Sequence, residues 1–191
     1  MTSAGRFTPL DLDPYANCVG IEPACRPGAG GFNIWRNTFP AEELPAGGSM
    51  VTVGAVPFRF PAADGVRADN IRCRGQLVTL PGTRVDWLYL LGAAERRTED
   101  ALTVCYAGGA CRRQWLRMSD FWPETDQWFG ELLAYRTTVM LYPQHAQDRM
   151  APSIWRQRVP VTVPDGAVGV ALPDNPAMHI FALTLLDEEA S

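Results

Sequence analysis

The amino-acid sequence predicts an all-β protein, a two-sheet antiparallel β-sandwich of roughly eight strands. Three observations support this prediction. Short segments alternate between apolar and polar residues and are rich in β-branched and aromatic types. Glycine (17) and proline (16) together supply 33 of the 191 residues, as a fold with many turns requires. Helical periodicity is almost absent, so the regular spacing of short strands and turns indicates a sandwich or jelly roll.

The first part of the chain, residues 1–49, is expected to be irregular, because turn-forming clusters occupy residues 26–31 and 45–48. Glycine reaches positive φ in such clusters, and proline cannot donate a hydrogen bond to a strand ladder. A length of 191 residues favours one domain over two. We therefore expect residues 1–191 to form a single domain that begins with an irregular segment.

Strands are predicted from residue 50 onward. The first strand region is a clear alternation, and the second is interrupted near Gly75. Gly108-Gly109 is a strong two-residue hairpin signal between two later strands. The predicted strand regions are residues 50–60, 70–80, 84–91, 101–107, 110–118, 131–142, 155–163, 167–172 and 178–186.

The segments between these strands carry weaker signals. Residues 126–131 are compatible with a short helix, and residues 143–153 have the composition of a loop. Pro160 places its strand near the edge of a sheet, because proline has no N–H to donate to a neighbouring strand.

Composition and charge exclude several classes of function. The net charge is −4 and there is no basic stretch, which argues against binding nucleic acid. No apolar run approaches the ~20 residues of a membrane span. All 17 cationic residues are arginine, so lysine-dependent chemistry, such as a Schiff base, is absent. The N-terminus shows no apolar signal region, and a cytoplasmic location is expected. The oligomeric state stays open.

The five cysteines leave their redox state open. Cys18 and Cys25 are close enough in sequence for a local bridge, as are Cys105 and Cys111, and Cys73 would be left over. Reduced thiols are the default expectation for a cytosolic protein. No pair has C-x-x-C spacing, so a structural zinc site is not expected.

Two residues are candidates for catalysis if the protein is an enzyme. His179 begins an apolar strand, where a histidine is either a satisfied structural group or a catalyst. Asp120 either caps a turn or serves as one of the paired carboxylates that glycosidic hydrolysis needs.

A polar group near residue 70 is a candidate ligand-binding set. Asp69 and Asn70 precede a strand, and Gln76 lies within it. The first two residues either form an Asx turn that opens the strand or join Gln76 in binding sugar hydroxyls. Their oxygen atoms could alternatively bind a structural calcium ion. No other metal or cofactor is expected.

Six tryptophans are numerous for this length, and indole faces stack on the apolar faces of sugar rings. Trp87 and Trp115 fit strand alternation and are expected to be buried. The recognition surface is predicted instead at three tryptophans in less regular segments. Arg156 follows the last of them and adds a planar hydrogen-bond donor. These three are Trp35, Trp128 and Trp155.

Several motifs together resemble a bacterial, actinobacterial-type β-sandwich module that is found beside glycoside hydrolase domains and here stands alone. The likeness implies a jelly-roll or galactose-binding-like fold and an association with carbohydrate, without catalysis. One departure is Tyr106-Ala107-Gly108-Gly109, where the family hairpin often has an aspartate. The motifs are residues 39–45, 53–61, 69–70, 75–76, 90–94, 119–122, 172–175 and 179–185.

The sequence therefore favours a non-catalytic carbohydrate-recognition module whose partner is a carbohydrate or a glycosylated small molecule. The alternative is a small cytosolic enzyme, with hydrolase-like chemistry, that acts on a glycosylated or polyketide-like metabolite. A third reading is an assembly protein that self-associates through an exposed sheet edge or aromatic patch. The first predicts a shallow groove with an exposed aromatic side chain, and the second predicts a deep pocket that holds Asp120 or His179.

Overall fold

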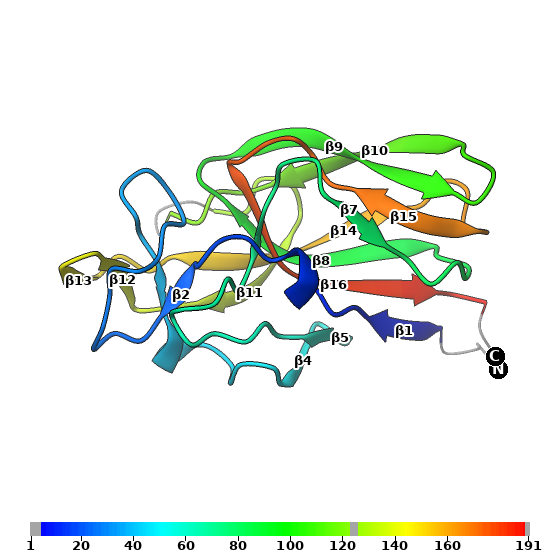
Figure 1. Ribbon diagram of the computed structural model, residues 1–191. Helices are drawn as coiled ribbons and strands as arrows, with labels where there is room; N and C mark the ends of the chain where they lie inside the picture. The colour runs from blue at the N-terminus through cyan, green and yellow to red at the C-terminus, as the bar shows by residue number, and fades with distance from the viewer. Residues whose placement is uncertain (1–4, 123–125, 190–191) are drawn as a thin grey trace.

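The computed structural model describes residues 5–122 and 126–189, and these form an almost entirely β structure (Figure 1). The predicted fold class is confirmed. Ten strands of the described residues form two principal sheets, against roughly eight predicted. The larger sheet contains β1 (Arg6–Pro9), β6 (Ile71–Arg72), β8 (Trp87–Ala94), β11 (Leu132–Arg136), β14 (Ser153–Pro160) and β16 (Met178–Asp187). The smaller contains β7 (Leu77–Thr79), β9 (Thr98–Tyr106), β10 (Cys111–Met118) and β15 (Ala167–Ala171).

All strand pairs of the two principal sheets are antiparallel. The larger sheet has the order β1-β16-β8-β14-β11, with β6 also paired to β16. The smaller sheet has the order β10-β9-β15-β7. Three two-stranded sheets lie outside these layers: β2 (Ile21–Glu22) with β3 (Phe39–Pro40), β4 (Met50–Val53) with β5 (Val56–Arg59), and β12 (Val139–Tyr142) with β13 (His145–Asp148).

Three predictions between residues 126 and 153 were wrong. The region 131–142 is two strands, because β11 pairs with β14 and β12 pairs with β13 in a separate sheet. The expected loop 143–153 contains β13, which pairs with β12. The expected short helix at 126–131 is absent from its described residues, where Gly130 has a φ of 73° that no right-handed helix accommodates. No helix of the described residues is long and apolar enough to span a membrane.

The main hydrophobic core lies between the two principal sheets. Leu90 and Leu183 of the larger sheet contact the same buried cluster as Leu102 and Leu116 of the smaller sheet. Each of these side chains alternates with a neighbour that points the other way, as strand geometry requires. The predicted sandwich therefore has its core where the alternation places it.

A second core covers the opposite face of the larger sheet. Leu91 and Phe181, which point away from the first core, pack against aromatic side chains of the N-terminal half, among them Phe32, Phe39 and Phe58. We name residues 20–63, which contain β2 to β5, the covering segment. Its strands β2, β4 and β5 lie across the larger sheet from β9 and β10 in Figure 1. The prediction that residues 1–49 are irregular was only partly right, because the described residues of this part contain β1, β2 and β3.

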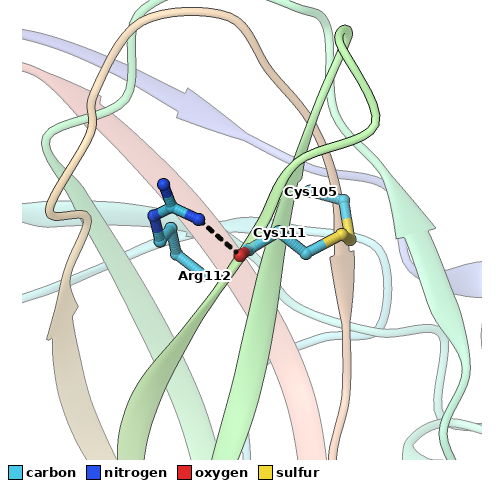
Figure 2. The surroundings of a disulfide bond; sticks show 3 residues. All are labelled: Cys105, Cys111 and Arg112. Atoms are coloured by element: carbon cyan, nitrogen blue, oxygen red, sulfur yellow. Dashed lines mark hydrogen bonds between the residues drawn. A yellow bond between two sulfur atoms is a disulfide. The ribbon is translucent and has the colours of Figure 1, made fainter.

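The hairpin of β9 and β10 carries a disulfide. Cys105 and Cys111 are directly opposite in the strand register, with Cα atoms 4.2 Å apart (Figure 2). The turn between the strands contains the predicted Gly108-Gly109 but is longer than two residues, because the Tyr106 N–H bonds the Ala110 carbonyl. Gly109 has a φ of 79° that favours glycine. The expectation of reduced thiols is thus wrong for this pair, because strand pairing brings the two sulfur atoms together. Cys18, Cys25 and Cys73 are free thiols.

Candidate functional site

Asp69 is buried beside the start of β2, where the covering segment begins. Its carboxylate accepts hydrogen bonds from the Gly20 and Ile21 backbone N–H groups and from the Asn70 side-chain amide. Burial raises the pKa of Asp69 to about 7, although these N–H donors oppose the shift by favouring the ionised form. The two backbone bonds reach residues 49 and 48 positions away, so they join two segments of the fold. They are not the local bonds of an Asx turn.

His179 lies against Asn70 at the start of β16. Its Nδ1 is 2.8 Å from the Asn70 Oδ1, while the Asn70 amide nitrogen donates to the Cys18 carbonyl. The imidazole Nε2 is buried without a hydrogen-bond partner, 3.9 Å from the nearest Glu95 oxygen. The Phe32 ring stacks on the imidazole at 3.9 Å between centroids. Burial lowers the pKa of His179, and so the ring is neutral near pH 7.

Gln76 completes the group that the sequence placed near residue 70. Its side-chain amide donates to the Arg72 carbonyl, and its oxygen accepts the Arg74 backbone N–H. The chain turns at Gly75, whose φ is 72°, as the predicted interruption of this strand region requires. The fold therefore brings Asp69, Asn70 and His179 into one hydrogen-bonded network and uses Gln76 to hold the adjacent turn.

A cleft of about 490 Å³ opens beside this network. Arg72 forms its wall, and its guanidinium donates to Glu95 at 2.6 Å and to the Pro176 carbonyl at 3.0 Å. Neither Asp69 nor His179 lines the cleft, because both are covered by the segments they join. The lining residues are Asn17, Cys18, Val19, Ala29, Gly31, Arg72 and Arg74.

The carboxylate of Asp69 is not arranged as a calcium ligand. Both of its oxygens already accept hydrogen bonds from N–H groups, and a cation would need those same lone pairs. Within residues 5–122 and 126–189 no three His, Cys, Asp or Glu side chains gather where a metal ion could sit. These residues therefore do not fit the structural calcium ion considered as an alternative.

Asp120 and His179 serve separate parts of the structure. The Asp120 carbonyl accepts the indole N–H of Trp155 at 2.8 Å, and Asp120 forms an isolated β-bridge with Ala94, the last residue of β8. The Asp120 Oδ1 is buried without a hydrogen-bond partner, but Asp120 does not line the cleft. The cleft therefore does not provide the deep pocket around Asp120 or His179 that the enzyme hypothesis requires.

Trp155 and Arg156 have structural contacts, and the prediction that Trp155 belongs to an exposed recognition surface was wrong. The indole is only 2% exposed, because β14 is a central strand and its two faces contact other layers. The Arg156 guanidinium donates to the Gly54 and Val53 carbonyls and lies over the Tyr89 ring. Arg156 therefore fastens the β4–β5 turn to the larger sheet.

Trp35 and Trp128 are exposed, as predicted, but each indole has a partner. Trp35 packs against Trp122 in an edge-to-face arrangement with 6.0 Å between ring centroids. The Arg97 guanidinium lies over the Trp128 ring at 4.4 Å from its centroid. A ligand that stacks on either indole would have to share or displace these contacts.

Trp115 is the exposed indole that sequence reasoning missed, and its predicted burial was wrong. The side chain is 68% exposed, because Gln114, Leu116 and Met118 occupy the buried face of β10. It lines a depression of about 190 Å³ together with Ala101, Arg113 and Gln114. A signal was available: the arginines two positions before and after Trp115 share its face.

The fold and these sites define a β-sandwich domain with buried polar groups that brace its loops and a surface of arginine and indole side chains. The chain belongs to the AziU2-like beta-sandwich domain family, whose model matches residues 6–189. This match confirms the β-sandwich module implied by the resemblance, while the association with glycoside hydrolases stays a prediction. A comparison with curated proteins found no match.

Proposed function

We propose that this protein is a non-catalytic domain that recognises a carbohydrate or the sugar of a glycosylated small molecule. The observation that carries the proposal is the environment of Trp115. Its indole is 68% exposed, and no aromatic ring or guanidinium of the described residues covers it. Trp35 and Trp128 are exposed to a similar extent, but their rings are already in contact with other side chains.

The neighbours of Trp115 suit a sugar ring. The residue opposite in the strand register is Ala101, which is too small to cover the indole face. An indole face packs on the apolar C–H face of a pyranose, while planar donors bond its hydroxyl groups. Arg113, on the same face of β10, supplies such donors at the edge of the depression. The volume of the depression, about 190 Å³, suits a single terminal sugar better than a long carbohydrate chain.

The same environment argues against glycosidic hydrolysis. That reaction needs two carboxyl groups on either side of the scissile bond. Neither the depression at Trp115 nor the cleft beside Arg72 has an Asp or Glu among its described lining residues. Recognition without turnover therefore agrees better with the surface chemistry than the enzyme hypothesis does.

A glycan array followed by calorimetry with the glycans that bind tests this proposal. We expect Trp115→Ala to weaken binding by about tenfold or more, because it removes the stacking surface. Trp128→Ala is the matched control, since it removes an exposed indole whose ring is already covered by Arg97. Its affinity should equal that of the unmodified protein.

Three results would contradict the proposal. The first is that no glycan on the array binds, and the second is that Trp115→Ala binds as tightly as the Trp128→Ala control. The third is a cleaved or altered glycan in the mass spectrum after incubation, which would favour the enzyme hypothesis.

A further inference from the structure

The cleft beside β6 has a cationic wall that the proposed sugar site does not use. Arg72, Cys73 and Arg74 alternate across the chain, so that the buried Cys73 points into the main core and both arginines line the cleft. The turn at Gly75 and the two Gln76 hydrogen bonds hold the backbone of both arginines in place. The guanidinium groups are therefore presented from a braced turn.

The charges of the two arginines are balanced differently. Arg72 pairs with Glu95 at 2.6 Å. No ion pair of Arg74 is found among residues 5–122 and 126–189. Among the residues that line the cleft, Cys18 adds no negative charge, because burial raises the pKa of its thiol to about 11. The carboxylates of Glu22 and Asp69 are not among the lining residues and accept hydrogen bonds from backbone N–H groups. The wall of the cleft thus carries one positive charge in excess.

We propose that this cleft binds a small molecule through an anionic group, a carboxylate, phosphate or sulfate, held by Arg74 with Arg72 beside it. Guanidinium groups bind such oxyanions through paired, charge-assisted hydrogen bonds. The cleft volume of about 490 Å³ lies within the range of small-molecule sites, and so the ligand extends beyond its anionic group. The inference does not depend on the proposed sugar site, which lies on the smaller sheet.

Titrations followed by ¹H–¹⁵N NMR test the site, with sodium phosphate, sodium sulfate and sodium acetate at constant ionic strength. We expect saturable shifts of backbone amides in residues 17–19, 29–31 and 72–74 with at least one of the three anions. Arg74→Gln should weaken the affinity by about tenfold or more, because it removes the unbalanced charge. Arg112→Gln is the matched control: this exposed arginine lies in the β9–β10 hairpin, and its loss should leave the affinity unchanged.

The three anions identify the chemistry of the ligand. Saturation by phosphate or sulfate alone assigns a tetrahedral oxyanion, and saturation by acetate alone assigns a carboxylate. The proposal is overturned if none of the anions gives saturable shifts in these residues, or if Arg74→Gln binds as well as Arg112→Gln. Because the sugar site is tested with Trp115→Ala and glycans, failure of one proposal is distinguishable from failure of the other.

Discussion

Three buried carboxylates, Glu22, Asp69 and Glu131, hold loops of this protein by accepting hydrogen bonds from backbone N–H groups. Glu22 accepts from Gly28, Ala29 and Gly30, and Glu131 accepts from Ser119 and Phe129. A buried carboxylate is costly unless such donors surround it. These residues therefore stabilise the conformation of the loops. None of them lines the cleft or the depression at Trp115.

His179 should make stability depend on pH. Burial lowers the pKa of its imidazole below the ordinary value of 6.5, so the unfolded chain binds the proton more readily than the folded one. The resulting stabilisation is fully present above pH 6.5 and is lost as the pH falls below it. We expect the free energy of unfolding to fall by up to about 1.4 kcal/mol per pH unit in that range.

Urea unfolding between pH 5 and 8 measures this effect. His179→Gln should remove the His179 contribution to the slope, because an amide does not titrate. His145→Gln is the control, since His145 is exposed and lies in the β12–β13 hairpin. The prediction fails if both variants keep the pH dependence of the unmodified protein. The raised pKa of Asp69 acts in the opposite direction between about pH 4 and 7, but it is present in both variants.

At the scale of elements, the β9–β10 hairpin shows which features of a strand the alternation of apolar and polar residues predicts. Both strands and the glycines between them were predicted, but β9 begins at Thr98, three residues before the predicted start at residue 101. The face assigned to Trp115 was wrong. Apolar size favours burial of an indole, but the pattern of β10 as a whole places Leu116 and Met118 inside.

The disulfide should stabilise this hairpin. Cys105 and Cys111 are six residues apart, and closing a loop of that length is expected to contribute about 2 kcal/mol to the free energy of unfolding. A reducing agent should lower the stability of the unmodified protein by about that amount. The double variant Cys105→Ser, Cys111→Ser should have about the stability of the reduced protein both with and without the reducing agent.

Urea unfolding with and without the reducing agent, together with a thiol count by mass spectrometry, distinguishes the outcomes. The remaining cysteines, Cys18, Cys25 and Cys73, are unpaired and control for general effects of the reagent. Equal sensitivity of the double variant and the unmodified protein to reduction would contradict a role for this bridge.

For the whole molecule, the larger sheet is a middle layer. One face of β8 and β16 meets the smaller sheet, and the other meets the covering segment, so β16 is buried along nine of its ten residues. A strand that is buried on both faces has an almost continuous apolar sequence. That is the character of residues 178–186, which carry no alternation to reveal the third layer.

Phe181 tests this arrangement because it joins the larger sheet to the covering segment. Its ring lies 5.9 Å from Phe39 and 6.4 Å from Phe32 between centroids. Phe181→Ala should lower the free energy of unfolding by about 3–5 kcal/mol, because it opens a cavity in the second core. Leu77→Ala, at an exposed position of β7, should change it by less than about 0.5 kcal/mol.

Urea unfolding measures both variants, and limited proteolysis locates the change. Phe181→Ala should also expose the covering segment, residues 20–63, to cleavage more readily than Leu77→Ala does. Equal stability of the two variants, or equal protection of that segment, would show that the second core does not hold this layer.

The sequence by itself determined the all-β class, most strand positions and the glycine turns, because these depend on local backbone preferences and on alternation along the chain. It also singled out Asp69, Asn70, Gln76 and His179, which the structure places close together. Only the tertiary structure decided which faces meet another layer, and so which indoles are exposed: Trp155 is buried and Trp115 is not. The physical reason is that alternation states which side chains share a face of a strand, while burial depends on the layer that packs against that face.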